Sequence, residues 1–252
     1  MNDIAIDIVN LSKRYSLSHQ HRPDSLKAWL RSLVNGGDAA ATGAAEEFWA
    51  LEDVSLQVRQ GECLALVGKN GSGKSTLLKI LSRVIPPTRG CVRIRGRIAS
   101  LLEVGTGFHP ELTGRENIFL NGAMLGCPER ELRHRLAAII DFSGVERFLD
   151  TPVKHYSSGM YVRLAYAVAA HVDADIMVVD EVLAVGDQDF QEKCLDHLTK
   201  LRDSGTTVIF VTHSQPLVAR LATHVAHLVA GRLEHRAHAP IELPTNESGS
   251  GS

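Results

Sequence analysis

Residues 64–81 read LALVGKNGSGKSTLLKIL and carry the strongest structural signal in the chain. A buried-strand pattern is followed by a glycine-rich loop and then by an apolar-periodic helix. The loop has the spacing G-x-x-x-x-G-K-S, which in this context is typical of a phosphate-binding loop. Backbone N–H groups and the helix start would hold the phosphates, with Lys74 reaching the β- and γ-phosphates and Ser75 binding Mg²⁺. The predicted phosphate-binding residues are Gly68, Lys69, Asn70, Gly71, Ser72, Gly73, Lys74, Ser75 and Thr76.

Apolar strand patterns alternate with helical patterns along the rest of the chain. The strands are IAIDIV (4–9), ECLALVG (62–68), CVRIRG (91–96), IMVVD (176–180) and TVIFVTH (207–213). This alternation predicts an α/β fold with a mostly parallel core sheet. Segments 48–58 and 91–102 are expected to be antiparallel, because they are taken to follow one another with only turns between them. Residues 105–172 are predicted to be a helical subdomain inserted into the sheet domain.

Composition limits the classes of function. The net charge of −2 gives no general electrostatic reason to bind nucleic acid. The four cysteines are far apart and indicate neither a disulfide framework nor a zinc site. The N-terminus does not resemble a signal peptide, and no apolar run approaches the ~18 residues of a membrane span. We therefore expect a soluble chain whose membrane role, if it has one, comes through a partner.

Acidic residues and a histidine follow two of the buried strands. Asp180 and Glu181 end the strand 176–179, where an acid beside a phosphate loop can hold Mg²⁺ and a second can orient or deprotonate water. The alternative is a solvated strand end. His213 ends the strand 207–211 and would point toward the crevice where ligands collect, although a lone histidine is commonly an ordinary polar residue.

Residues 156–160, YSSGM, raise a separate question because they precede the helical run MYVRLAYAVAAHV. A serine at a helix start is first of all an N-cap. Two hydroxyls, a bare glycine backbone and a helix dipole also make an anion site. Ser157, Ser158 and Gly159 are therefore candidates for a second phosphate-binding helix start.

These motifs together resemble the ATPase subunits of ABC transporters, over roughly residues 4–235. YSSGM is similar to the signature motif LSGGQ of that family, which binds the γ-phosphate held by the other subunit. LLEVGTGFHPELTGRENIFLNGAMLG (101–126) and DEVLAVGDQDFQEKC (180–194) are similar to the branch that exports polysaccharide, O-antigen and teichoic acid. The resemblance implies an α/β P-loop NTPase fold with a mostly parallel core sheet, an antiparallel β-subdomain and an inserted helical subdomain.

The resemblance also implies roles for individual residues. Asp180 would be the Walker B aspartate that holds Mg²⁺, Glu181 the catalytic base and His213 the switch histidine. Asp187 would belong to the D-loop that contributes to ATP binding. Tyr15 would stack on the base, with packing at a strand edge as the equal alternative. The family's usual Gln before the helical subdomain is missing, and Glu103 is the nearest polar candidate for its contact with the metal ion.

We therefore expect a subunit that binds ATP and Mg²⁺, hydrolyses ATP and forms a homodimer. With two permease chains it would export lipid-linked polysaccharide, at the cytoplasmic face of the inner membrane and without binding nucleic acid. The alternatives are an ABC ATPase for another cargo, or a soluble ABC-type ATPase that acts on ribosomes or DNA.

The remaining segments complete the expected organisation. Residues 1–240 are predicted to form one ATPase domain, and residues 241–252 a flexible tail. An extended loop, 16–47, contains Leu26, Trp29, Leu30, Leu33 and Val34 at helical spacing, which predicts a short amphipathic helix. That helix would rest on the permease or on lipid headgroups, or else pack on its own domain.

Overall fold

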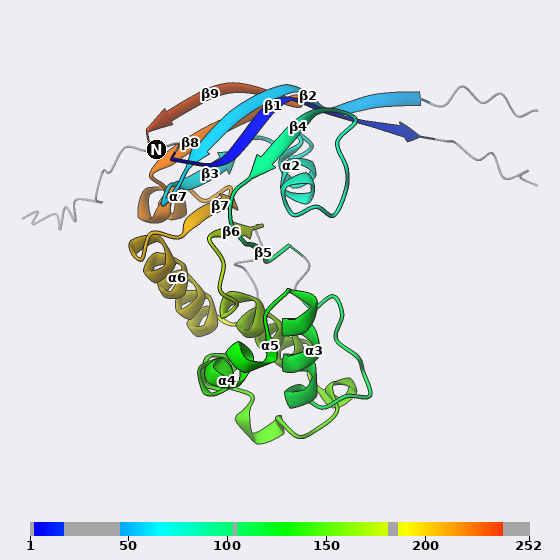
Figure 1. The fold of residues 1–252 in the computed structure, drawn as a ribbon, viewed down its shortest axis with the longest axis vertical. Helices are drawn as coiled ribbons and strands as arrows, with labels where there is room; N and C mark the ends of the chain where they lie inside the picture. Colours follow the sequence, from blue (N-terminus) through cyan, green and yellow to red (C-terminus); the bar gives the residue numbers. More distant parts are fainter. Residues whose placement is uncertain (1–2, 18–45, 103–104, 181–185, 239–252) are drawn as a thin grey trace, which may run out of the picture.

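The computed structural model describes residues 3–17, 46–102, 105–180 and 186–238, and the fold is given for these ranges. Their strands form two sheets, shown in Figure 1. The amphipathic helix predicted within 16–47, with its apolar residues from Leu26 to Val34, lies outside the described residues, and so does the tail 241–252. Both remain predictions.

The larger sheet has six strands in the order β5-β6-β7-β3-β8-β9. The first five are parallel to their neighbours, and β9 pairs antiparallel with β8. The mostly parallel core sheet is therefore confirmed. The strands are β3 (Cys63–Val67), β5 (Ile98–Ser100), β6 (Ile176–Val179), β7 (Thr207–Val211), β8 (His224–Val229) and β9 (Arg232–His238).

Alternate residues of the central strands enter two different hydrophobic cores. Leu64 and Leu66 of β3 pack in a core shared with the smaller sheet and α2 (Lys74–Leu81). Cys63 and Ala65 pack in the opposite core with α5 and α6. Strands β6 and β7 divide their side chains between the same two cores. Burial on both faces explains why these strands are continuous apolar runs in the sequence.

The smaller sheet is antiparallel, with the order β2-β1-β4, and lies at the top of Figure 1. Its strands are β1 (Ile4–Leu17), β2 (Glu46–Arg59) and β4 (Arg89–Ile94). Segments 48–58 and 91–94 are antiparallel as predicted, but both pair with β1 and not with each other.

The prediction for the end of segment 91–102 was wrong. Residues 98–100 leave the antiparallel sheet and form β5, which pairs parallel with β6. The change of sheet follows a turn at Gly96, after which the Arg97 backbone N–H donates to the Asp175 carboxylate over 2.6 Å. Because Asp175 directly precedes β6, this bond places β5 beside the start of that strand.

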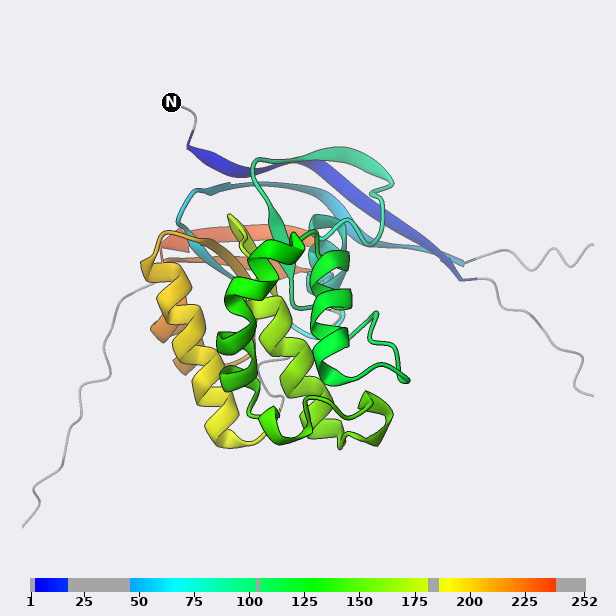
Figure 2. The same cartoon turned by 60° about the horizontal axis from the view of Figure 1, so that its bottom comes forward.

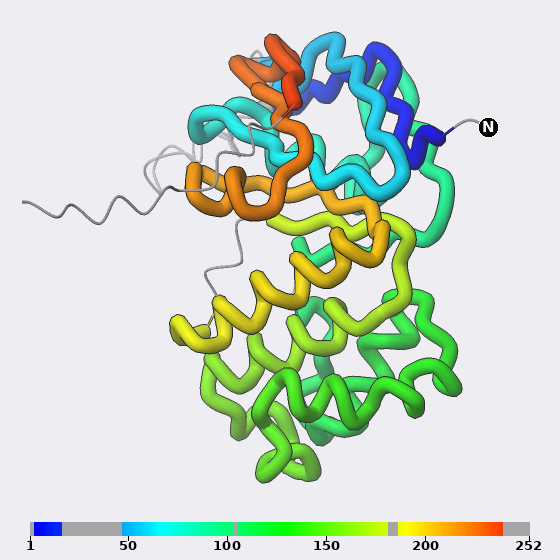
Figure 3. Tube along the Cα trace, turned by 90° about the vertical axis from the view of Figure 1, so that its left-hand side faces the viewer, coloured from blue at the N-terminus to red at the C-terminus, as the bar shows by residue number. Residues whose placement is uncertain are grey.

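Three helices, α3 (Gly114–Met124), α4 (Glu129–Ser143) and α5 (Ser158–Ala170), lie between β5 and β6 in the chain. Figures 1 and 2 show them packed together, on the side away from the smaller sheet. Short 3-10 turns at Glu146–Phe148 and Val153–His155 connect α4 to α5. In Figure 3 the yellow helix α6 (Gln188–Asp203) lies between this group and the strands, and α7 (Gln215–Leu221) follows β7.

Local hydrogen bonds fix where the helical group begins. The Thr113 hydroxyl accepts a hydrogen bond from the Glu116 N–H, and the Glu116 carboxylate accepts one from the Thr113 N–H, which is a capping box. Asn117 is fully buried and donates to the carbonyls of His109, Leu112 and Thr113. None of the helices in the described ranges is long and apolar enough to cross a bilayer.

We expect Gly90→Ala to destabilise the protein more than Gly205→Ala. Both residues have left-handed backbones, with φ of +79° and +88°, so both substitutions add backbone strain. A Cβ at Gly90 would also lie 2.3 Å from the Asn10 carbonyl oxygen, whereas a Cβ at Gly205 has no neighbour within 4 Å. Urea denaturation should show a loss of about 1 kcal/mol for Gly205→Ala and about 3 kcal/mol for Gly90→Ala. Equal losses would contradict the tight β1–β4 contact.

Candidate functional site

The glycine-rich loop leads from the end of β3 into α2. Gly73 is the N-cap of α2, with φ of +104°, and a Cβ there would lie 2.4 Å from the Ala50 carbonyl oxygen. Lys74 is only 6% exposed, and its Nζ donates to the carbonyls of Gly68 over 2.7 Å and Lys69 over 3.0 Å. The lysine side chain thus connects the end of the loop to its beginning. Loop and helix start together form a cradle of backbone N–H groups suited to phosphate.

A cavity of about 340 Å³ opens beside this cradle. Asp180 follows β6 and His213 follows β7, and β6, β7 and β3 are parallel neighbours in the sheet. Parallel strands bring their carboxyl ends to one edge, so the acid, the histidine and the loop meet there. The cavity is lined by Tyr15, Phe48, Ala50, Asn70, Gly71, Gly73, Lys74, Ser75, Thr76, Asp180, Val211 and His213.

The structure therefore brings nine of the predicted site residues together in one cavity. They are Tyr15, Asn70, Gly71, Gly73, Lys74, Ser75, Thr76, Asp180 and His213. Gly68, Lys69 and Ser72 belong to the same loop but do not line the cavity. Ser75 and Asp180 supply hydroxyl and carboxylate oxygens, the donors that Mg²⁺ prefers, so the residues present fit that ion. Glu181 and Glu103 lie outside the described residues.

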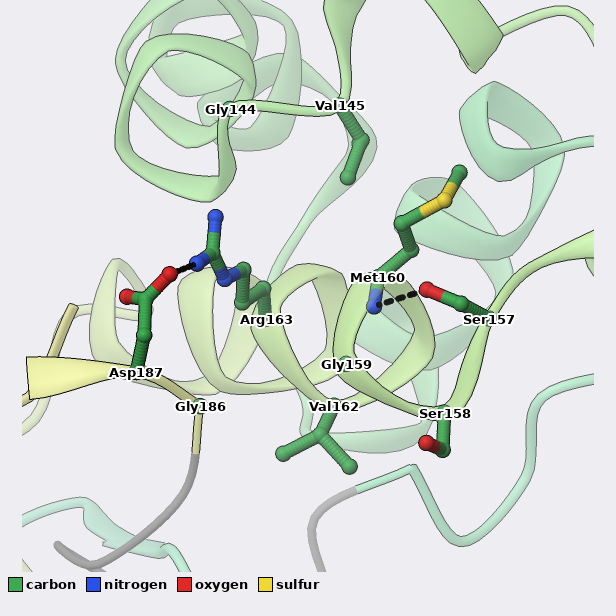
Figure 4. Close-up of a pocket in the computed structure, with 10 residues that line it drawn as sticks. All are labelled: Gly144, Val145, Ser157, Ser158, Gly159, Met160, Val162, Arg163, Gly186 and Asp187. Atoms are coloured by element: carbon green, nitrogen blue, oxygen red, sulfur yellow. Dashed lines mark hydrogen bonds and ion pairs between the residues drawn. The ribbon is translucent and has the colours of Figure 1, made fainter.

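A second cavity, of about 590 Å³, lies at the start of α5 and is shown in Figure 4. The Ser157 hydroxyl accepts a hydrogen bond from the Met160 N–H over 3.2 Å and caps the helix. Ser158 is exposed and its hydroxyl points away from that bond. Ser157 therefore serves as the N-cap, as one interpretation of YSSGM predicted, and Ser157, Ser158 and Gly159 all line the cavity. None of the residues that line this cavity lines the first one.

Asp187 lines the second cavity beside these serines and is the N-cap of α6. One carboxylate oxygen accepts a hydrogen bond from the Phe190 N–H over 3.0 Å, and the other forms an ion pair with Arg163 of α5. The bond from Phe190 is the main cause that lowers the pKa of Asp187, and the Arg163 charge adds to it. Both carboxylate oxygens are therefore engaged within the chain.

Arg163 and Phe48 are among the cavity-lining residues that the sequence analysis did not predict. Arg163 follows Gly159 by one helical turn, but its partner is 24 residues further along the chain, so spacing alone did not reveal the pair. Phe48 belongs to the string EEFWAL and lines the first cavity because β2 pairs with β1. The aromatic pair Phe48-Trp49 in an expected strand was the available signal.

A strand–loop–helix phosphate cradle, with an acid and a histidine at the carboxyl ends of neighbouring parallel strands, defines a P-loop nucleotide-binding protein. A profile of the ABC transporter family matches residues 51–184, and the chain belongs to that family. It is an ATP-hydrolysing cassette of the ABC type.

Sequence similarity to known proteins extends over nearly the whole chain. Two proteins of Klebsiella pneumoniae named O-antigen export system ATP-binding protein RfbB are 42% and 46% identical, over 90% of this chain and 91% of theirs. The teichoic acids export ATP-binding protein TagH of Levilactobacillus brevis is 39% identical over 92% of this chain and 62% of its own length.

Solved structures agree with the fold. A bacterial ABC transporter cassette determined as a dimer has 25% identity and a TM-score of 0.70, over 93% of this chain and 98% of its own. A dimeric cassette in a post-hydrolysis state with ADP and phosphate has 24% identity and a TM-score of 0.71. ABC ATPase architecture, expected from the motifs, is thereby confirmed.

We expect Asp187→Ala to destabilise the protein more than Asp187→Asn. Both substitutions remove the ion pair with Arg163. Asparagine keeps an oxygen that can accept the Phe190 N–H, whereas alanine removes this helix cap as well. Because the folded pKa is lowered, the charge of Asp187 stabilises the fold fully above the ordinary aspartate pKa of about 4, and this contribution is lost as the pH falls through the lowered value.

The measurement is the free energy of unfolding of wild type, Asp187→Asn and Asp187→Ala as a function of pH. The advantage of wild type over Asp187→Asn should be constant near neutral pH and shrink in acid. A difference between these two proteins that does not change with pH would show that the charge of Asp187 has no part in stability.

Proposed function

We propose that this chain is the ATPase subunit of an exporter of lipid-linked polysaccharide, of O-antigen, capsule or teichoic-acid type. Two copies would act with two chains of a separate membrane permease, at the cytoplasmic face of the membrane. The observation that carries the proposal is the similarity to O-antigen export ATP-binding proteins over 90% of this chain and 91% of theirs. A match over nearly all of both chains supports a shared role better than the P-loop, which many unrelated proteins contain.

In this proposal the first cavity binds ATP. The loop residues from Gly68 to Thr76 hold the phosphates through backbone N–H groups and the Lys74 ammonium. Ser75 and Asp180 hold Mg²⁺, which neutralises charge on the β- and γ-phosphates. Lys74 is already directed along the loop by its bonds to Gly68 and Lys69, so little side-chain ordering is needed when the phosphates bind.

The proposed hydrolysis uses groups at the same edge of the sheet. Glu181 follows Asp180 directly and would orient the attacking water and accept its proton. His213, exposed at the end of β7 and lining the cavity, would contact the γ-phosphate. Glu103 stands near the position where the family has a glutamine, and we propose that it assists at the metal ion.

The second cavity would complete the ATP site of the other subunit. It has an exposed serine at the N-terminus of a 13-residue helix, as an anion site requires, but it shares no lining residue with the first cavity. In a symmetric homodimer the second cavity of one copy can face the first cavity of the other, because each copy can present the start of its α5 to the phosphate loop of its partner. The dimeric form of similar cassettes supports this arrangement.

We expect two inactive variants to restore activity to one another when mixed. Lys74→Ala damages the phosphate loop, and Ser158→Arg blocks the second cavity. A mixed dimer has one site with both defects and one site with neither. Random pairing makes half of the dimers mixed, so ATPase activity of the assembled exporter should reach about a quarter of the wild-type value. The control is a chain carrying both substitutions mixed with either single variant, which forms no intact site. Activity equal in the test and control mixtures would contradict the shared site.

The cargo can be tested in cells that lack the chain. We expect them to accumulate lipid-linked polysaccharide on the cytoplasmic side of the membrane, and wild type to restore surface polysaccharide. Lys74→Ala should fail to do so, while Lys79→Ala, an exposed lysine later on the same helix, should succeed. Normal surface polysaccharide in cells without the chain would contradict this cargo and leave another substrate of the ABC class.

A further inference from the structure

Phe48 is an exposed aromatic residue that lines the first cavity. With 44% of its surface accessible, it is among the most exposed large apolar side chains in the described part of the protein. It lies on β2, some 20 residues before the phosphate loop, yet lines the same cavity as Lys74 and Ser75. Because the ring lines a cavity next to the phosphate loop, it is placed to contact a ligand bound there.

The pairing of β1 with β2 places this ring. Phe48 is the direct cross-strand partner of Tyr15, and the two rings stack with centroids 5.6 Å apart and an interplanar angle of 24°. Cross-strand neighbours in an antiparallel pair project from the same face, so both rings reach the cavity together. Figures 1 and 2 show the paired ends of β1 and β2 extending past the six-stranded sheet.

The next aromatic residue along β2 has a different environment. Trp49 is half-buried and does not line the cavity. The guanidinium groups of Arg14 and Arg89 lie over its ring, 5.6 Å and 5.2 Å from the centroid. Trp49 therefore contributes to packing through cation–π contacts, and Phe48 is the ring of this pair that faces the ligand cavity.

We propose that Phe48 is a second base-stacking residue, which forms with Tyr15 a two-ring platform for the base of the bound nucleoside triphosphate. This rests on the proposed function, in which the cavity binds ATP. Such a platform recognises the flat face that every base has, so it adds affinity with little discrimination among bases. The loop holds the phosphates at one end of the cavity, and the platform holds the base at the other.

The test compares ATP with inorganic tripolyphosphate, which can occupy the phosphate loop but has no base. Equilibrium binding to the full chain would be measured by calorimetry for wild type and Phe48→Ala. We expect Phe48→Ala to weaken ATP binding about five- to tenfold, at the low end of the range for stacking because the site is open to water. GTP should weaken by a similar factor, and tripolyphosphate binding should be unchanged.

Three variants serve as controls. Phe148→Ala removes a similarly exposed phenylalanine, 49% accessible, from the turn after α4, and should leave ATP binding unchanged. Phe48→Trp restores a large π-face and should recover the affinity. Phe48→Leu keeps apolar bulk on the strand without a π-face and should behave like Phe48→Ala.

The outcomes separate the inference from the function on which it rests. Wild-type ATP affinity in Phe48→Ala would overturn the inference alone, and so would an equal loss of ATP and tripolyphosphate, which indicates a distorted β1–β2 pair. Full affinity for ATP in Lys74→Ala would instead overturn the assignment of the cavity to ATP, and the platform with it.

Discussion

A buried ammonium group holds the phosphate loop in shape. Lys74 is 6% exposed, and a charge removed from water to this extent is costly unless polar atoms surround it. The carbonyls of Gly68 and Lys69 supply two of those atoms from the beginning of the loop, while Lys74 itself is the first residue of α2. The lysine therefore joins both ends of the loop. Position 73 requires glycine for a separate reason, because the loop passes too close to the Ala50 carbonyl for any side chain.

The parallel sheet brings polar residues from distant parts of the chain to the phosphate loop. Because β6, β7 and β3 are adjacent and parallel, residues 180 and 213 reach the loop although they are more than 100 residues away in the chain. The strands can be placed this way because both of their faces are buried, one under α2 and the smaller sheet and the other under α5 and α6. The two cores fix the strands, and the strands fix the distances among the polar groups at their ends.

The sequence predicted the features that local spacing determines. The phosphate loop, the acid and histidine after apolar strands, and the helix start at YSSGM are contiguous motifs, and each has a structural context that the residues themselves indicate. Features that depend on pairing between distant segments were not predictable in this way. The register of β1 against β2 decides that Phe48 and not Trp49 faces the cavity, and no pattern within EEFWAL carries that register. The transfer of residues 98–100 to the parallel sheet depends on a hydrogen bond to Asp175, which is 78 residues from Arg97.

The ion pair between Arg163 and Asp187 joins α5 to α6 at the second cavity. Arg163 lies on α5, one turn after Gly159, and Asp187 is the N-cap of α6. The guanidinium also lies over the ring of Phe190, 5.3 Å from its centroid, so the pair is held from two sides. Since both oxygens of Asp187 are engaged within the chain, its contribution to a nucleotide site would come from fixing the helix start rather than from a direct carboxylate contact, which phosphate charge would oppose.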